Sequence, residues 1–427
     1  MTDRTMLDGE MLSVPAMIIR GGTSKGVFLR GRDLPDDTSL WGPYLIDMFG
    51  ARDVRQIDGI GGAVPTTSKC CIVESSTRDD TDVDYTFAQV GIGEERVYWD
   101  FNCGNLTPAV GTFAILAGLV EPRPGMTTVR IYQTNTKIPI DVTVPTTGDG
   151  SPLVAGDYRI AGVSNTGAAV MTDFSRATGA SLGRGLFPTG RRTDRLTIPG
   201  LGEVRCTIVD LANMCVFFRA EDTGMTGTEM PERGPELVGT FTAIRRAAQD
   251  LLGVDPSKTT PWPVAVGAPR PFSLYGSGRT LGAEECDFTV RFAGIQPMRD
   301  TMHEAFPGTA SACTAVAAVT AGTVVNTVYA ALPHTDDTVR LAHPSGVSVV
   351  HAAVSDGAAD GDDVLDRCTV DHVRMGRTVR PIMRGEVLVR RDEVERLCDA
   401  LRTADPTRSG VPTAMKETQR HTAASAF

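Results

Sequence analysis

The chain has 427 residues, of which 41% are hydrophobic and 22% are charged, as is ordinary for a globular protein. This length allows two domains of about 150 to 200 residues each. A formal net charge of -10 argues against non-specific binding to nucleic acid or a bilayer, because both partners require a basic surface. We find no signal peptide, no apolar run of about 18 residues, and no disulfide or metal spacing among the nine cysteines, so we expect a cytoplasmic protein with reduced thiols.

The first segment that carries chemistry is the glycine-rich sequence RGGTSKG at residues 20–26. It is not a phosphate loop, because that motif requires Gly-x-x-x-x-Gly-Lys-Ser/Thr before a helix and a strand-like run follows here. The turn offers backbone N–H groups, two hydroxyls and two cations, which together suit a carboxylate. A plain tight turn is the alternative. The residues predicted to bind substrate in this segment are Arg20, Thr23, Ser24 and Lys25.

A similar turn precedes an apolar strand at residues 58–73, DGIGGAVPTTSKCCIV. Thr67 and Ser68 add hydroxyls that could bind substrate, and Lys69 stands immediately before the strand. A lysine at the edge of a strand is usually exposed to solvent. In a closed cleft, however, burial favours the neutral amine, and Lys69 then becomes a candidate general base.

Cys103 lies in DFNCGNLTPAVG, residues 100–111, directly before a predicted buried helix whose first turn suits Pro108. The N–H groups at the amino end of a helix favour an anion, which stabilises a thiolate and can also hold a substrate carboxylate. We therefore predict a reactive thiol at Cys103 and substrate-binding N–H groups at Gly104 and Asn105. The alternative is a structural cysteine, which would not need polar neighbours.

Periodicity predicts further elements along the chain. Alternating β-branched residues predict strands within 129–144, and apolar residues at helical spacing predict helices in 236–253 and 390–402. Both helices are expected to pack on a core without chemistry of their own. Residues 403–427 are polar, small and aperiodic, which predicts a flexible tail.

Two pairs of segments repeat in the same order. VFLRGRDL at 27–34 is similar to VFFRAEDT at 216–223, and CGNLTPAVGTFAILAG at 103–118 corresponds to SACTAVAAVTAGTVVN at 311–326. Such an order favours a duplicated architecture. Two similar halves in turn predict an active site in the cleft between them.

The second half offers fewer chemical groups. His343 and Ser345 in HPSG are candidate substrate-binding residues, and Arg380 in GRTVRPIMRG supplies positive charge. The six histidines show no metal-ligand spacing, so we expect no metal.

Seven segments together resemble the PrpF family of isomerases, over roughly residues 15 to 390. They are MIIRGGTSKGVFLRGRDLP, DGIGGAVPTTSK, DFNCGNLTPAVGTFA, GLFPTGRRTDRL, ACTAVAA, HPSG and RTVRPIMRG. The resemblance implies an α+β fold of two similar diaminopimelate epimerase-like domains, each a central helix wrapped by mixed or antiparallel β-sheet. We expect these domains at 12–190 and 191–395, with the active site in the cleft between them.

The resemblance also implies an activity that needs no cofactor. Family members isomerise unsaturated di- or tricarboxylic acids such as methylaconitate, aconitate or 4-oxalomesaconate, by an allylic 1,3-proton shift that migrates the double bond or exchanges cis and trans. Lys69 and Cys103 fall on the family's active-site lysine and cysteine. The sequence does not determine the substrate, the outcome of the shift, the oligomeric state or the order of the two proton carriers. A homo-oligomer is compatible with it.

Two other functions are compatible with the same residues. One is a non-catalytic polycarboxylate-binding protein that assists an aconitase-like hydratase, which would need anion-binding turns but no reactive thiol. The other is an amino-acid racemase or epimerase of the same fold with two opposed cysteines. The repeat aligns Ser311 with Cys103 and places Cys313 two residues later, which weakens the racemase reading and suggests that Cys313 is a packing residue.

Overall fold

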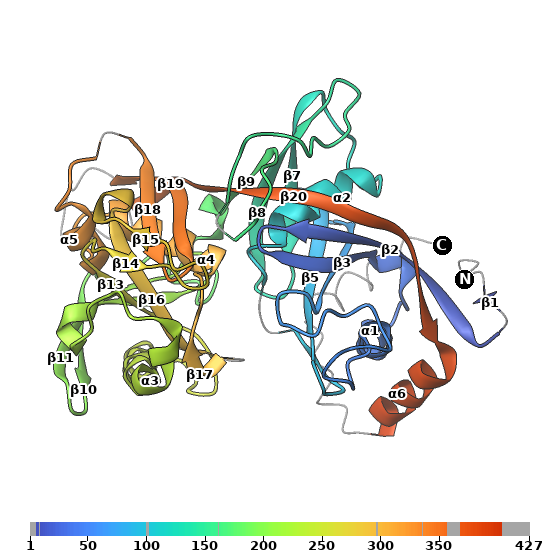
Figure 1. The fold of residues 1–427 in the computed structure, drawn as a ribbon, viewed down its shortest axis with the longest axis horizontal. Coiled ribbons are helices and arrows are strands. Elements are labelled where there is room, and N and C mark those ends of the chain that lie inside the picture. Colours follow the sequence, from blue (N-terminus) through green and yellow to red (C-terminus); the bar gives the residue numbers. More distant parts are fainter. Residues whose placement is uncertain are drawn as a thin grey trace. The chain divides into compact units, whose positions relative to one another are not determined.

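The computed structural model describes residues 6–7, 9–99, 102–160, 162–295, 298–334, 336–356 and 368–403. The chain divides into two compact units (Figure 1). Unit 1 takes residues up to 159, residues 163–172 and residues from 377 on, and unit 2 takes residues 160–162 and 173–376. Among the described residues, no helix is both long enough and apolar enough to span a membrane.

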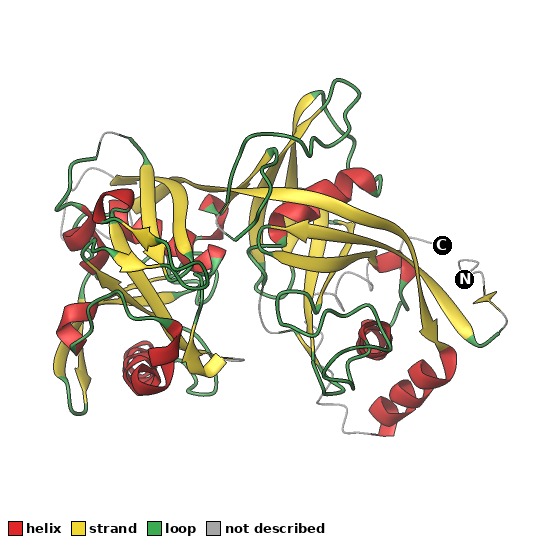
Figure 2. Ribbon diagram, viewed as in Figure 1, coloured by secondary structure: helices red, strands yellow, loops and turns green. Residues whose placement is uncertain are grey.

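Strands predominate over helices in both units (Figure 2). The elements up to the end of β9 are β1 (Met6–Leu7), β2 (Met11–Gly21), β3 (Ser24–Arg30), η1 (Gly31–Asp33), η2 (Thr38–Leu40), α1 (Trp41–Phe49), β4 (Lys69–Ser75), β5 (Val83–Val90), β6 (Val97–Tyr98), α2 (Thr107–Leu116), β7 (Gly125–Gln133), β8 (Ile138–Thr146) and β9 (Ala169–Asp173). Those of unit 2 are η3 (Ser175–Ala177), β10 (Asp194–Ile198), β11 (Gly202–Val209), β12 (Cys215–Arg219), η4 (Ala220–Thr223), η5 (Pro231–Arg233), α3 (Gly234–Leu252), β13 (Trp262–Gly267), β14 (Phe272–Ser273), β15 (Thr280–Leu281), η6 (Ala283–Glu285), β16 (Phe288–Ile295), β17 (Met298–Met302), α4 (Gly308–Val319), α5 (Val324–Tyr329), β18 (Thr338–His343) and β19 (Gly346–Asp356). β20 (Cys368–Arg390) begins in unit 2 and ends in unit 1, where α6 (Arg391–Thr403) follows it.

The two units repeat one pattern of strand pairing. In unit 1, the neighbours β2, β3, β4, β5, β7 and β8 pair in the order antiparallel, parallel, antiparallel, parallel, antiparallel. In unit 2, the neighbours β11, β12, β13, β16, β18 and β19 pair in the same order. Each parallel pair requires a crossover connection, and α1, α2, α3 and the α4–α5 pair lie in these connections. The predicted α+β fold with two similar halves is therefore confirmed.

The first sequence repeat coincides with this duplication. Residues 27–34 form the end of β3 and the turn η1, and residues 216–223 form β12 and the turn η4. The second repeat is out of register. Cys103 precedes the first residue of α2 by four positions, whereas Ser311 lies three residues inside α4. The alignment of Ser311 with Cys103 is therefore wrong, because it rested on small residues that recur throughout both helices.

Each unit has a helix buried on almost every side. Thr107 to Ile115 of α2 are all buried, and α2 contacts β2, β4, β7 and β8. Gly308 to Ala318 of α4 are buried as well, against β11, β12, β18 and β19. Cys313 of α4 has no exposed surface, and its thiol lies 3.5 Å from the carbonyl oxygen of Val209, as a packing residue would. A helix that is apolar all round requires this kind of enclosure.

The carboxyl-terminal residues return to the amino-terminal unit. β20 pairs antiparallel with β2 along the whole of β2, from Met11 opposite Arg390 to Gly21 opposite Val379. α6 then packs on α1 through Val394, Leu397 and Cys398. The units therefore differ from the predicted ranges 12–190 and 191–395. Pairing between strands this far apart in the chain cannot be recognised from neighbouring residues in the sequence. Residues 404–427 of the predicted tail lie outside the described residues.

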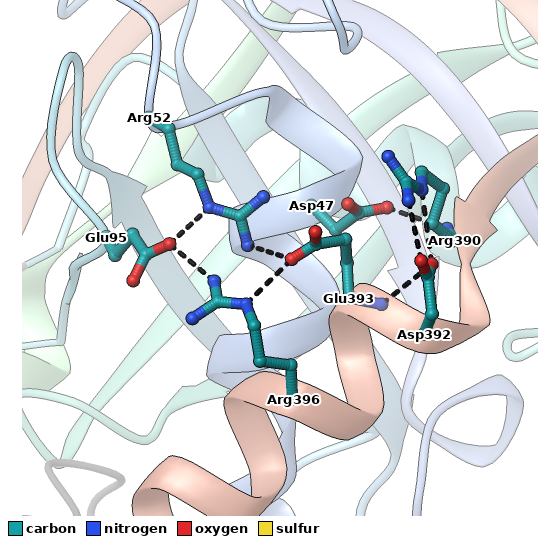
Figure 3. A network of polar contacts seen from close by, with 7 residues as sticks. All are labelled: Asp47, Arg52, Glu95, Arg390, Asp392, Glu393 and Arg396. Carbon is teal, nitrogen blue, oxygen red and sulfur yellow. Dashed lines mark hydrogen bonds and ion pairs between the residues drawn. The ribbon is translucent and has the colours of Figure 1, made fainter.

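A ring of ion pairs holds α6 to unit 1 (Figure 3). Arg52 contacts both Glu95 and Glu393, and Arg396 contacts the same two carboxylates. Beside the ring, the backbone N–H of Arg390 donates to Asp47 of α1 at 2.7 Å. The ring joins α6 to the loops that follow α1 and β5, but its side chains are 21% to 49% exposed to solvent, so we attribute most of the docking to the apolar contacts.

Two carboxylates lie directly opposite each other in the middle of the sheet of unit 1. They are Glu74 of β4 and Asp84 of β5. Burial, and after it the charge of Asp84, raises the pKa of Glu74 from 4.5 to about 7. Burial also raises the pKa of Asp84. Like charges opposite each other destabilise a sheet, so this pair resists ionisation.

We expect Glu74→Gln to stabilise the protein above about pH 4.5, with the full gain reached once the pH exceeds about 7. Because the pKa of folded Glu74 is raised, its favourable contribution is fully present below about pH 4.5 and is lost as the pH rises through about 7. The full shift corresponds to at most about 3 kcal/mol, and partial exposure reduces this to about 1 to 2 kcal/mol. Glutamine stays neutral, so urea unfolding should show no gain at about pH 4 and the full gain at about pH 8.5. A gain that is the same at both pH values, or one shared by the exposed control Glu203→Gln, would contradict this prediction.

Candidate functional site

The sheet of unit 1 has one face toward α1 and α6 and another toward α2. Val27, Leu29, Cys70 and Ile72 belong to the core that includes α1 and α6. Phe28, between the first two in β3, instead has its ring 5.5 Å from that of Phe113 in α2. Since side chains alternate along a strand, the odd-numbered residues of β4 and β5 lie on the α2 face. Among them are Lys69, Cys71, Tyr85, Phe87 and Gln89.

Lys69 is a buried lysine with a neutral partner. It is 8% exposed and lies directly opposite Gln89, whose Oε1 accepts a hydrogen bond from Nζ at 2.6 Å. The amide of Gln89 cannot turn freely, because its Nε2 donates to the carbonyl oxygens of Ser68 at 2.8 Å and Pro65 at 3.3 Å. The ring centroid of Phe87 lies 5.1 Å from Nζ. No carboxylate of the described residues forms an ion pair with this amine, and the solvent-exposed lysine considered as the alternative is ruled out.

Cys103 lies in the turn that leads into α2, and it is 9% exposed. Its carbonyl oxygen accepts hydrogen bonds from the backbone N–H groups of Leu106 and Thr107, both at 3.0 Å. Two N–H groups near the start of the helix are therefore already bonded. Those of Gly104 and Asn105 form no backbone hydrogen bond to any described residue. These are the N–H groups that the sequence predicts for a substrate carboxylate.

Lys69 and Cys103 lie around a common neighbour, Cys71. Both act electrostatically on its thiol, in opposite directions, although burial is the main reason that the pKa of Cys71 is raised. The thiol of Cys71 lies 3.7 Å from the hydroxyl of Tyr85. Burial, followed by the charges of Cys71 and Cys103, raises the pKa of Tyr85 as well. At neutral pH this face therefore holds a protonated phenol and a protonated thiol beside the two candidate proton carriers.

The glycine-rich turn between β2 and β3 closes against the start of α2. A Cβ on Gly21 would lie 2.5 Å from the carbonyl oxygen of Asn105, and one on Gly22 would lie 2.6 Å from its Oδ1. Gly22 also has a φ of 53°, a conformation that favours glycine. Asn105 Nδ2 donates to the hydroxyl of Thr23 at 3.1 Å, and Ser24 is buried in the same turn. The structure thus brings four of the predicted substrate-binding residues together: Thr23, Ser24, Gly104 and Asn105.

The predicted cations lie on the other face of this sheet. Cβ atoms on Gly21 and Gly26 would meet α2 or its first turn, so their neighbours Arg20 and Lys25 point away from α2. Arg20 lies directly opposite Lys25 on β3 and directly opposite Arg380 on β20, so the three cations form one row. They are therefore separate from the cluster of Lys69 and Cys103.

Arg20 already has a structural role in that row. Its Nη1 donates to the carbonyl oxygen of Gly22 at 3.0 Å and to both the carbonyl and hydroxyl oxygens of Thr378, at 2.8 Å and 3.0 Å. These bonds fix the β2–β3 turn to β20. Burial, followed by the charge of Arg380, lowers the pKa of Arg20.

The hydroxyls before Lys69 bond within their own loop. Thr67 Oγ1 donates to the carbonyl oxygen of Val64 at 3.2 Å, and Ser68 Oγ donates to Gln56 Oε1 at 2.5 Å. Ser68 has no exposed surface. We infer that these two residues shape the loop that leads into β4, whereas the sequence suggested that they bind substrate.

The remaining predicted residues belong to unit 2. His343 ends β18 and pairs with Gly346 across the turn to β19, and its side chain is buried. The hydroxyl of Ser345 donates to the carbonyl oxygen of Glu304. Both therefore lie in the β18–β19 turn, and the hydroxyl of Ser345 has a partner inside its own unit.

Two residues of the α2 face were missed by sequence reasoning. Gln89 orients Lys69, and its only signal was one amide side chain in the strand VDYTFAQV, which also contains Asp84 and Thr86. Asn102, directly before Cys103, is buried, and its amide lies against the first residue of α2. Among the described residues, no group of three or more His, Cys, Asp or Glu side chains is arranged to hold a metal ion.

Comparisons with known proteins bear on this arrangement. A family model described as PrpF protein matches residues 11–390. The 3-methylitaconate isomerase of Eubacterium barkeri is 38% identical over 391 residues, covering 89% of this chain and 98% of that protein. The 2-methyl-aconitate isomerase of Shewanella oneidensis is 37% identical over 401 residues, covering 88% of this chain and 97% of that protein. A crystal structure of methylitaconate-delta-isomerase has a TM-score of 0.77 at 37% identity, covering 90% of this chain and 97% of that chain.

Proposed function

Because the chain belongs to the PrpF family, we propose that it is an isomerase that moves one proton across an allylic unit of an unsaturated polycarboxylic acid. The observation that supports the proposal is that Lys69 is a buried amine paired only with the neutral amide of Gln89 on the α2 face of unit 1, while Cys103 is buried in the turn that leads into α2. Two buried groups that can each carry a proton suit a reaction that removes a proton at one carbon and returns one two carbons away.

The chemistry follows from the substrate class. One carrier takes a proton from a carbon next to a carboxylate or its vinylogue, and the electron pair left behind spreads over the allylic unit and the carboxylate as a dienolate. The second carrier protonates the far carbon, and the double bond then lies one position along the chain. If the delocalised intermediate rotates before it is reprotonated, the same site exchanges cis and trans.

The negative charge that develops on carboxylate oxygens needs hydrogen-bond donors. The N–H groups of Gly104 and Asn105 lie at the amino end of α2, beside the turn that contains Thr23. Donors held in place before the reaction stabilise such charge without rearranging. We assign this role to the α2 face and not to the row of Arg20, Lys25 and Arg380 behind the sheet.

We place the enzyme in the cytoplasm. Its cysteines form no disulfide among the described residues. Buried thiols that are not oxidised suit a reducing compartment.

The proposal is tested by incubating the protein in D₂O with cis-aconitate, trans-aconitate, methylaconitate or 4-oxalomesaconate and following proton NMR. We expect one acid to isomerise with deuterium entering one allylic carbon. Binding of an acid with neither isomerisation nor exchange would instead favour a polycarboxylate-binding accessory protein. Exchange at the α-carbon of an amino acid would favour a racemase.

A further inference from the structure

The amide nitrogen of Asn102 is a buried donor that has no partner in the described part of the chain. The side chain is 6% exposed, and Nδ2 forms no hydrogen bond to any described residue. A buried polar group that has lost its hydrogen bonds to water and gained none in the protein destabilises the folded state. Such groups are therefore rare and call for an explanation.

The rest of this amide is fixed in place. The hydroxyl of Thr107, the first residue of α2, lies 3.3 Å from Asn102 Oδ1 and 3.1 Å from the carbonyl oxygen of Cys103, and these two acceptors share its single proton. With Oδ1 held against the first turn of α2, Nδ2 is held there too. The unpaired donor thus lies at the same helix end as the N–H groups of Gly104 and Asn105.

We propose that Asn102 Nδ2 donates a hydrogen bond to a carboxylate oxygen of the bound polycarboxylate, at the amino end of α2. The identity of this ligand rests on the proposed function. A carboxylate oxygen accepts several hydrogen bonds at once, so it can take the amide N–H together with the helix N–H groups. The bond strengthens as charge moves onto that oxygen in the dienolate, which makes Asn102 part of the stabilising set for the reaction.

The decisive variant is Asn102→Leu, which has a similar size and no donor. If the amide serves a ligand, removing it should leave the urea midpoint of the free protein unchanged or higher, since an unpaired buried donor has been removed and the hydroxyl of Thr107 keeps its bond to the carbonyl oxygen of Cys103. For the acid that the wild type isomerises, kcat/KM should fall about 100-fold, as for loss of one preorganised donor. Asn102→Asp, which places a negative charge beside the substrate carboxylate, should raise KM in addition.

A paired asparagine provides the matched comparison for stability. Asn213 Nδ2 donates to the hydroxyl of Thr309, in the first turn of α4, at 2.5 Å. Asn213→Leu removes a bond that the folded protein makes, so its urea midpoint should fall while that of Asn102→Leu does not.

Two results would overturn the inference. One is a fall in the urea midpoint of Asn102→Leu as large as that of Asn213→Leu, which would show that the protein itself pairs the amide. The other is an unchanged kcat/KM in a folded Asn102→Leu variant. A wild type that isomerises none of the acids contradicts the proposed function separately. In that case the readout is the rise in melting temperature caused by trans-aconitate, which Asn102→Leu should lose; a rise that is unchanged from the wild type would refute the inference.

Discussion

Lys69→Met is expected to lower kcat by about 10³-fold while the protein stays folded. Methionine matches the unbranched stem of lysine as far as Cε and fills most of the same buried space beside Phe87, but it lacks the amine and carries no proton. A positioned acid or base contributes about 10²- to 10⁴-fold, and the change removes that group completely. Lys258→Met, at an exposed lysine of unit 2, is the control and should keep wild-type turnover. Turnover within about tenfold of the wild type in a folded Lys69→Met variant would exclude Lys69 as a proton carrier.

Deuterium exchange in this variant also decides the order of the two carriers. If Lys69 removes the first proton, Lys69→Met should abolish both exchange of the substrate and isomerisation. If Lys69 returns the proton, the variant should still exchange substrate hydrogen with solvent but form no product. Cys103→Ser should then show the opposite behaviour. Loss of both activities in both variants would mean that the two transfers are strongly coupled.

Local chemistry was enough to select the two candidate proton carriers. Cys103 stands out because polar residues surround it before an apolar helix, and Lys69 because it precedes a run of apolar residues at the end of a glycine-rich turn. Both signals arise from neighbouring residues in the chain. The same holds for the helix α3, which lies where apolar periodicity predicts it.

Strand register determines what local chemistry could not predict. Arg20 and Thr23 are three residues apart, yet Thr23 contacts Asn105 and Arg20 points to the other side of the sheet. The distinction depends on which residue of β2 faces α2, and only the pairing with β3 and β20 fixes it. The role of Gln89 could not be predicted from the sequence for the same reason, because it depends on lying opposite Lys69 in the neighbouring strand.

Gln56→Leu is expected to destabilise the protein by about 2 to 4 kcal/mol, the sum for two or three buried polar groups left without partners. Gln56 is 1% exposed, and it supports the loop that leads to Lys69. Its Oε1 accepts from the N–H of Ala63 at 2.8 Å and from the hydroxyl of Ser68 at 2.5 Å, while Nε2 donates to the carbonyl oxygen of Gly91 at 3.2 Å. Leucine fills the space but makes none of these bonds.

The measurement is urea unfolding followed by tryptophan fluorescence, since Trp41 and Trp99 both lie in the core of unit 1 beside this loop. Gln56→Glu, measured at about pH 4 so that its buried carboxyl is protonated and uncharged, keeps acceptors for Ala63 and Ser68 and loses only the N–H donor to Gly91, so it should be destabilised by less than Gln56→Leu. If the two variants lose equal stability, the bond from Gln56 to the carbonyl oxygen of Gly91 dominates, and the loop is fixed mainly by its contact with the end of β5. If the order is as expected, the bonds to Ala63 and Ser68 dominate. The hydrogen bonds of Gln56 then fix the turn before β4, and the position of Lys69 depends on a side chain 13 positions before it in the chain.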